Sequence, residues 1–151
     1  MMYNNVVQLS VWICPFKFVS CPYYRKIVQQ LRQNGRRVAV TATTGMAANM
    51  IAGETLHHWC GIGDLRHTDT ALLSALHHTE VERRIRETDV LLIDEVGMLS
   101  ATTFNTVEYI CRNVRQVDKV FGGIQVRLCK GNRECIILYI RHINRNNSVA
   151  V

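Results

Sequence analysis

The stretch Leu91-Leu92-Ile93-Asp94-Glu95 constrains the fold of this chain more than any other part of its sequence. With Val90 it places four apolar residues in a row directly before two carboxylates. An uninterrupted apolar run of this kind predicts a strand buried on both faces, which is typical of parallel sheets covered by helices. Because ligands of such sheets bind beyond the carboxyl ends of the strands, Asp94 and Glu95 stand where a ligand site is expected.

The rest of the chain alternates expected helices with short apolar strands. Apolar residues at helical spacing over 24–31 predict a helix that stops at Gly35, and Ser100 is a suitable N-cap for another helix. Further helices are expected over 46–51, 69–76 and 81–87, and further strands over 6–21, 38–40, 124–128 and 135–140. This alternation predicts an α/β fold with a mainly parallel sheet.

Charge is segregated along the 151 residues. The chain has 18 basic and 12 acidic residues, and the net charge of +6 divides into +6 over 1–53, −6 over 54–108 and +6 over 109–151. Basic blocks of this kind allow a polyanionic partner such as nucleic acid, although solvated basic faces without a partner are the alternative.

The six cysteines include no CxxC pair, which disfavours a zinc site and indicates reduced thiols of an intracellular protein. The interrupted apolar segment 6–21 is too short to span a membrane.

Two motifs carry candidate chemistry. Asp94 can hold Mg²⁺ directly or through water and Glu95 can polarise an attacking water, the chemistry of nucleotide triphosphate hydrolysis; an exposed acidic pair at a strand end is the alternative. The second motif is the strand and small-residue loop that lead to Thr44 and Gly45, whose backbone N–H groups and hydroxyls can take phosphate oxygens. His57 and Trp59 offer a stacking surface for an unpaired base, or else are a buried histidine and a core aromatic.

Residues 25–126 resemble the first motor domain of Pif-type ATP-dependent DNA helicases, which are superfamily-one, RecD-like enzymes. The stretches that carry the resemblance are RRVAVTATTGMAA (36–48), TLHHWCGIG (55–63), LLIDEVGML (91–99) and FGGIQV (121–126), the third of which resembles a Walker B motif. The resemblance implies a RecA-like P-loop NTPase domain of three layers that uses ATP and Mg²⁺. It also implies that Asp94 and Glu95 serve Mg-ATP hydrolysis, and that Thr44, Gly45, His57 and Trp59 contact single-stranded DNA.

Two departures from the family pattern matter. The family has a G-x-x-x-x-G-K-[ST] phosphate loop before its first helix, whereas residues 12–22 contain no glycine and Lys17 is not in a GK[ST] context. After Val126 the sequence also leaves the family's Gln-Leu-Pro-Pro stretch, and the second motor domain is missing. We therefore expect an incomplete domain without the Walker A strand and loop: a divergent segment over 1–22, a partial motor domain over 23–128 and a divergent tail over 129–151.

Three functional hypotheses follow. The resemblance implies an ATP-dependent helicase that unwinds DNA in repair, recombination and telomere maintenance, with single-stranded DNA and duplex junctions as partners, no membrane, and a nuclear or alternatively mitochondrial location. The second hypothesis is a catalytically dead remnant that at most binds single-stranded nucleic acid. The third is a gene-model fragment without a stable fold. For the chain acting alone, the missing phosphate loop favours the second and third hypotheses.

Overall fold

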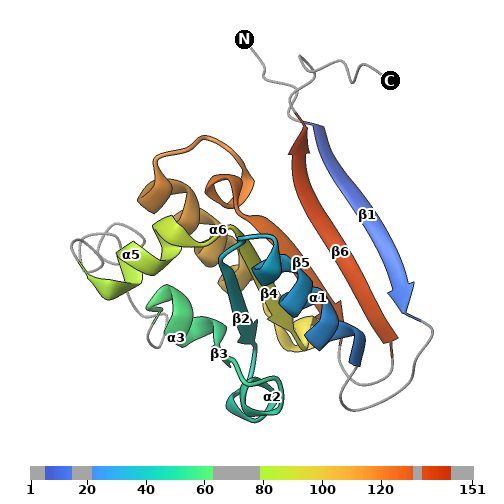
Figure 1. Cartoon of the computed structure of the whole chain (residues 1–151). Helices are drawn as coiled ribbons and strands as arrows, with labels where there is room; N and C mark the ends of the chain where they lie inside the picture. The colour runs from blue at the N-terminus through green and yellow to red at the C-terminus, as the bar shows by residue number, and fades with distance from the viewer. Residues whose placement is uncertain (1–5, 15–21, 63–78, 131–133, 144–151) are drawn as a thin grey trace, which may run out of the picture.

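The computed structural model describes residues 6–14, 22–62, 79–130 and 134–143, and their side chains over 25–62 and 79–129. Figure 1 shows the arrangement of the elements. The strands are β1 (Val6–Cys14), β2 (Val38–Ala42), β3 (Glu54–Thr55), β4 (Val90–Asp94), β5 (Gln125–Lys130) and β6 (Glu134–Ile143). The helices are α1 (Pro22–Gln33), α2 (Gly45–Met50), α3 (Leu56–Cys60), α5 (Glu80–Glu87) and α6 (Ala101–Arg115), with 3-10 turns η1 (Val96–Met98) and η2 (Val120–Gly123).

The described strands form one sheet in the order β1-β6-β5-β4-β2-β3. Four neighbouring strands, β5, β4, β2 and β3, are parallel. β6 then runs antiparallel to β5, and β1 runs antiparallel to β6. The predicted α/β fold with a mainly parallel sheet is therefore confirmed, and β4 lies between two parallel neighbours as its apolar sequence requires.

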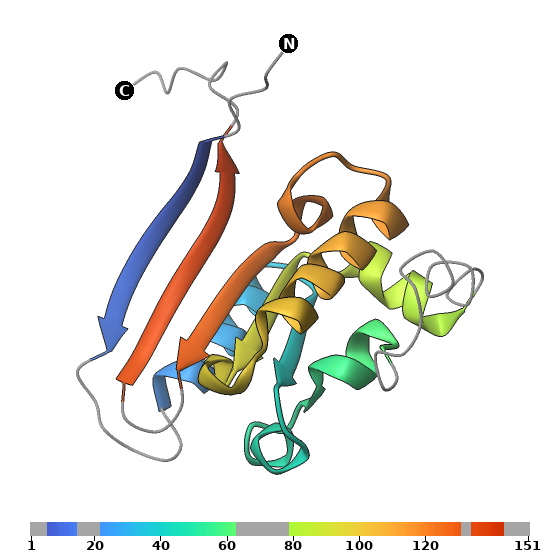
Figure 2. The same cartoon turned by 180° about the vertical axis from the view of Figure 1, so that it is seen from behind.

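Helices cover both faces of the sheet, which gives three layers. In Figures 1 and 2, α1 lies on one face, and α3, α5 and α6 lie on the other. Side chains alternate across β4, so that Leu91 and Ile93 join the larger core under α3, α5 and α6, whereas Leu92 packs toward Val28 of α1. The α1 side has the smaller core, because only one described helix covers it.

Short polar side chains set the beginnings of the helices. The hydroxyls of Thr44, Thr55, Thr79 and Ser100 each accept a hydrogen bond from a backbone N–H one turn later, at the starts of α2, α3, α5 and α6. These bonds satisfy N–H groups that otherwise lack a partner inside the helix. The predicted Ser100 cap is confirmed, and Gly35 takes the left-handed φ of 73° expected beyond the end of α1.

Gly122 allows η2 to pack closely against the last turns of α6. Its φ is +58°, and a Cβ atom on it would lie 2.6 Å from the carbonyl oxygen of Cys111 and 2.9 Å from Cδ of Arg115. Only glycine combines this conformation with such a close approach. Gly122 thus forms a tight contact that brings the chain from α6 back into β5.

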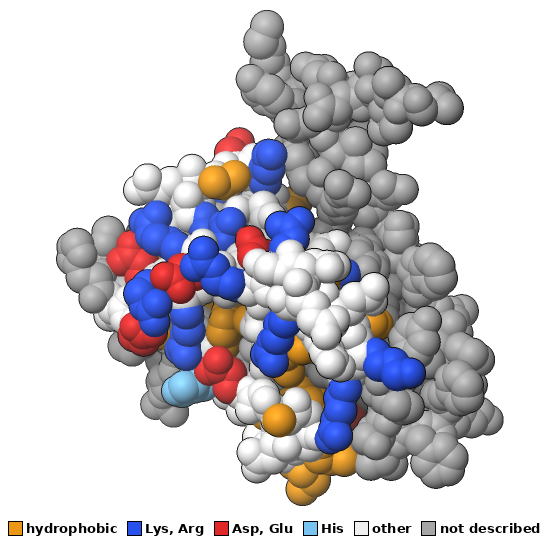
Figure 3. Space-filling model, in the orientation of Figure 1, with side chains coloured by type: hydrophobic (Ala, Val, Ile, Leu, Met, Phe, Trp, Pro, Cys, Tyr) orange, Lys and Arg blue, Asp and Glu red, His pale blue; other side chains and the backbone are white. Residues whose placement is uncertain are grey.

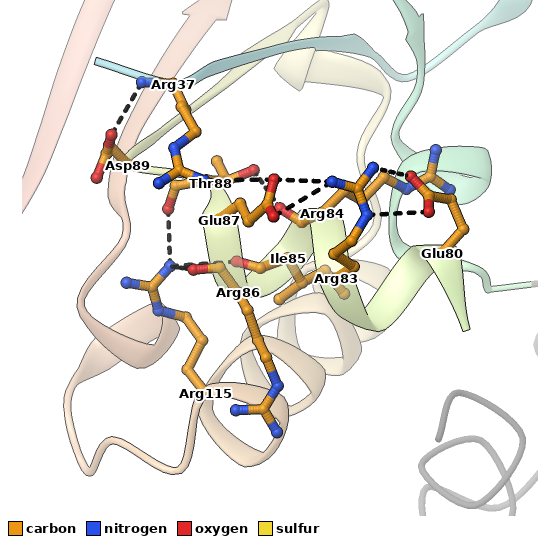
Figure 4. Close-up of polar contacts among 10 residues, drawn as sticks. All are labelled: Arg37, Glu80, Arg83, Arg84, Ile85, Arg86, Glu87, Thr88, Asp89 and Arg115. Carbon is orange, nitrogen blue, oxygen red and sulfur yellow. Dashed lines mark hydrogen bonds and ion pairs between the residues drawn. The ribbon is translucent and has the colours of Figure 1, made fainter. Parts of the chain in front are cut away.

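A network of charged side chains joins α5 to the amino ends of β2 and β4. Figure 4 shows Arg83 paired with Glu80 and Glu87, and the backbone N–H of Arg37 donating to Asp89 at 2.9 Å. These groups are largely exposed, so each pair contributes little to stability by itself. The network lies at the opposite end of the strands from Asp94, where Arg37 pairs with Glu87 at 3.3 Å and so links the start of β2 to α5.

Most of the predicted elements are present with shifted ends. The helices predicted over 46–51 and 81–87 begin one residue earlier, and the strands predicted over 124–128 and 135–140 are β5 and β6. β1 confirms the strand prediction over 6–14. The helix predicted over 69–76, segment 15–21 and the tail beyond residue 143 lie outside the described residues, and the division into segments at 22 and 128 stays a prediction.

Candidate functional site

Asp94 and Glu95 lie at the carboxyl end of β4, in the middle of the parallel strands. Asp94 is the last residue of the strand and pairs in register with Ala42 at the end of β2. The residues before it, 90–93, are almost fully buried, and Asp94 and Glu95 are partly exposed. The strand thus delivers two carboxylates from a closed core to an open edge, where ligands of parallel sheets bind.

Threonines of β2 and of its following loop hold this edge together. The backbone N–H of Thr43 donates to the carbonyl oxygen of Asp94 at 3.2 Å, and its Oγ1 donates to the carbonyl oxygen of Glu95 at 3.1 Å. The buried Oγ1 of Thr41 donates to the carbonyl oxygen of Leu92 at 2.8 Å. The sequence prediction missed both threonines as site residues; their signal was the placement of hydroxyls in an otherwise apolar strand and its loop.

The surroundings of Asp94 disfavour its charged form. Burial raises the pKa of the Asp94 carboxyl, opposed in part by the backbone N–H of Glu95, which donates to Oδ1 at 2.9 Å. Glu95 itself has a φ of 56°, a left-handed conformation that costs a non-glycine residue roughly 1–2 kcal/mol. Such backbone strain at a ligand-binding edge is typical of functional positions.

The oxygen atoms at this edge suit Mg²⁺. Within the described part of the chain, Oδ1 of Asp94 has a hydrogen-bond partner and Oδ2 has none. Among the described residues no group of three or more His, Cys, Asp or Glu side chains converges on a possible ion. An ion held by one or two carboxylates that keeps most of its waters is how Mg²⁺ commonly binds, so Asp94 fits the role of contacting it directly or through water.

Thr44 and Gly45 stand beside the carboxylates, one and two residues after Thr43. The Thr44 hydroxyl accepts the N–H of Ala47 at 3.3 Å, which caps α2. Gly45 is exposed, and no atom lies within 4 Å of the position that a Cβ would take. The structure therefore brings Thr44 and Gly45 to the same edge as Asp94 and Glu95, and leaves the position of a Cβ on Gly45 open.

Trp59 does not lie on the surface. It is 1% exposed and packs in the larger core with Leu56, one turn earlier on α3, and with Ile85 of α5. The prediction that Trp59 stacks on a base is therefore wrong for this structure, because α3 turns the indole toward the sheet; the core alternative holds.

His57 is partly exposed, and its contact with DNA stays a prediction. Its neighbour His58 is exposed, with Nδ1 2.6 Å from Oε2 of Glu54.

None of the helices in the described segments is both long enough and apolar enough to cross a membrane.

Comparisons with known proteins place these observations in a family. The profile of the PIF1-like helicase family matches residues 21–151. The chain is 42% identical over 100 residues to the ATP-dependent DNA helicase Pif1 of Psychrobacter sp., which covers 66% of this chain and 15% of that protein. It is 40% identical over 92 residues to the ATP-dependent DNA helicase RRM3 of Saccharomyces cerevisiae, covering 60% of this chain and 13% of that protein. The chain thus spans only a small part of these relatives.

Solved structures agree with the sequence comparison. The crystal structure of Pif1 helicase from Candida albicans is similar with a TM-score of 0.67 and 38% identity, over 70% of this chain and 25% of that chain. Bacteroides Pif1 bound to single-stranded DNA is similar with a TM-score of 0.54 and 27% identity, over 66% of this chain and 24% of that chain. The chain belongs to the PIF1-like helicase family, as part of its α/β motor domain.

Proposed function

We propose that this chain is part of a Pif-type ATP-dependent DNA helicase, which couples ATP hydrolysis to DNA unwinding in repair, recombination and telomere maintenance. The observation that carries the proposal is the placement of Asp94 and Glu95 at the carboxyl end of β4, joined through Thr43 to the loop that contains Thr44 and Gly45. Membership of a family of ATP-dependent DNA helicases supports the same reaction.

The two carboxylates have different roles in this proposal. Asp94 would hold Mg²⁺ directly or through water, and the ion would neutralise charge on the phosphates of ATP. Glu95 would orient the attacking water and accept its proton. A Bacteroides Pif1 has been crystallised with ADP-AlF4, and its structure is similar to this chain with 26% identity, which supports ATP as the substrate.

The neighbouring loop would contact DNA. Thr44 and Gly45 offer a hydroxyl and backbone N–H groups to phosphate oxygens, and His57 lies further along the same segment. A structure of Bacteroides Pif1 bound to single-stranded DNA supports single strands as a partner. A structure that describes DNA unwinding at forked duplex DNA by two coordinating Pif1 helicases supports duplex junctions. Trp59 has no part in this contact, because it is buried. We also propose that the protein acts in the nucleus, with the mitochondrion as the alternative. Imaging the tagged protein in its source cell would test this location.

The chain by itself is proposed to be catalytically dead and at most to bind single-stranded nucleic acid. Its sequence contains no G-x-x-x-x-G-K-[ST] stretch, so the backbone cradle and the lysine that hold β- and γ-phosphates in P-loop enzymes are not supplied by these 151 residues.

The test measures phosphate release from Mg-ATP with and without single-stranded DNA. We expect no turnover by the 151-residue chain, so its rate of phosphate release should equal that of the Glu95→Gln variant. Turnover that disappears in Glu95→Gln would refute the statement that the isolated chain is dead. In a chain extended with a GK[ST] phosphate loop, DNA-stimulated turnover that survives both Glu95→Gln and Asp94→Asn would refute the proposed roles of the carboxylates.

A further inference from the structure

A pocket of about 330 Å³ opens on the α1 side of the sheet. Its walls are formed by α1, β2 and the turn that follows α2: Arg25, Val28, Gln29, Arg32, Val40, Ile51 and Ala52. Figure 3 views this side of the molecule, where basic side chains lie beside patches of apolar atoms. The pocket combines an apolar floor with a positively charged rim, and the proposed helicase chemistry uses none of these residues.

The rim has a regular spacing. Arg25, Val28, Gln29 and Arg32 stand at positions i, i+3, i+4 and i+7 of α1, which places them on one face of the helix. The two arginines are therefore separated by about 10 Å along the helix axis, with Val28 between them. Both are exposed, and neither forms an ion pair with any described side chain. Residues 22–33 contain no acidic residue that could neutralise them.

The floor of the pocket is preformed. The turn after α2 is pressed onto β2 so closely that a Cβ on Gly53 would lie 2.4 Å from the carbonyl oxygen of Val40. The N–H of Gly53 donates to the carbonyl oxygen of Ala48 at 2.9 Å, which fixes the turn. Val40 and Ile51 are only partly buried, so both keep apolar surface that a ligand could cover. A preformed apolar floor lowers the entropic cost of binding.

We propose that this pocket docks an acidic amphipathic helix of a partner protein. The partner would carry two carboxylates seven residues apart, which pair with Arg25 and Arg32, and apolar side chains at the third and fourth positions between them, which enter the pocket. Charge complementarity selects an acidic partner, and the apolar floor selects a peptide over a nucleic acid. A sugar-phosphate backbone would match the arginines but would leave the exposed apolar surface of Val40 and Ile51 uncovered.

The test uses the full 151-residue chain and a fluorescein-labelled helical peptide with Glu-x-x-Leu-Leu-x-x-Glu at its centre. Fluorescence anisotropy measures the binding of the peptide to the chain. We expect saturable binding that weakens about tenfold or more in the double variant Arg25→Glu/Arg32→Glu, because two attractions become repulsions. Lys26→Glu is the matched control, since Lys26 is an exposed basic residue of α1 that does not line the pocket. A peptide with lysine at both glutamate positions should bind the double variant better than it binds the unchanged chain.

The peptide itself supplies the second arm of the test, which holds even if the double variant does not fold. Replacing both leucines with serine should reduce binding to the unchanged chain about tenfold, because the pocket floor then loses its apolar partner. Serine and leucine peptides that bind equally would overturn the proposal. Equal losses for Lys26→Glu and the arginine variant would overturn it as well, as would an oligonucleotide that displaces the peptide at lower concentration than the unlabelled peptide does. ATP and DNA are not needed, so failure of this inference is separate from failure of the helicase proposal.

Discussion

Arg115 holds the end of α5 to α6, and its replacement by methionine is expected to destabilise the domain well beyond the loss of a surface charge. Its Nη1 atom donates to the carbonyl oxygens of Ile85, Arg86 and Thr88 at 3.1, 3.1 and 2.7 Å. These carbonyls lie at the C-terminal end of α5 and just beyond it, where helical acceptors lack a partner of their own. Figure 4 shows the guanidinium reaching this end of the helix.

The magnitude follows from the number of bonds that one nitrogen can form. Nη1 carries two hydrogens, so the three contacts amount to about two full hydrogen bonds, each contributing roughly 1.5–3 kcal/mol when the donor is charged. Water reaches the carbonyl of Arg86 and recovers part of the loss. We therefore expect Arg115→Met to lower the free energy of unfolding by about 2–4 kcal/mol. Methionine keeps the aliphatic stem that packs near Gly122, so lost packing adds little.

Urea unfolding of the full chain, followed by far-ultraviolet circular dichroism, measures this loss. Arg112→Met is the matched control, because Arg112 lies one turn earlier on α6 and forms an exposed i,i+4 pair with Glu108 at 3.1 Å. Such a pair contributes only about 0.3–0.5 kcal/mol. Arg115→Lys should fall in between, because it keeps the charge but loses the planar fork. If Arg115→Met costs no more than Arg112→Met, the bonds to the end of α5 do not stabilise the domain and the reasoning fails.

Three other expectations test separate parts of the structure. Trp59→Ala should lower the free energy of unfolding, measured by urea unfolding, by about 3–5 kcal/mol, because the indole is 1% exposed. A variant that stays stable but binds single-stranded DNA more weakly would instead support the stacking role. Gly122→Ala should cost about 2 kcal/mol or more by the same assay, since φ is +58° and its Cβ would meet the carbonyl of Cys111 at 2.6 Å; an unchanged midpoint would show that η2 moves freely. Asp94→Asn should be stabilising at neutral pH, because burial raises the pKa of Asp94 and its ionised form therefore costs folding energy. The stability of the unchanged chain should then fall as pH rises from the ordinary carboxyl pKa through the raised one, and the stability gained by the Asp94→Asn substitution should grow across that pH window and level off above it.

The sequence predicted the elements whose signals are local. The apolar run at 90–93 identifies β4 because four consecutive buried residues leave few alternatives to a central strand. The helix that ends near Gly35 follows from its apolar spacing and from the left-handed glycine beyond it. The position of Asp94 and Glu95 at a ligand-binding edge could be predicted for the same reason, since it follows from where β4 ends.

Other features depend on packing that the sequence does not display. α3 has only five residues, too few for a helical period to show, so the direction of Trp59 toward the core could not be read from the residues around it. The bond from Thr43 to the carbonyl of Glu95 joins residues 52 positions apart and exists only because β2 and β4 are neighbours in the sheet. The antiparallel pairing of β1 with β6 likewise follows from which strand edges are left free, which apolar composition does not specify.

The pairing of β1 with β6 has a consequence for how this chain is made. Val6 pairs with Ile143, and the register continues without a break to Cys14 and Cys135. During synthesis β1 emerges before its partner β6, because all the elements from α1 to β5 lie between the two strands in the sequence. Through that interval the apolar segment VVQLSVWIC has unpaired backbone groups on both edges. Until β6 emerges, this strand is therefore open to aggregation, and a chaperone that covers it would protect the nascent chain.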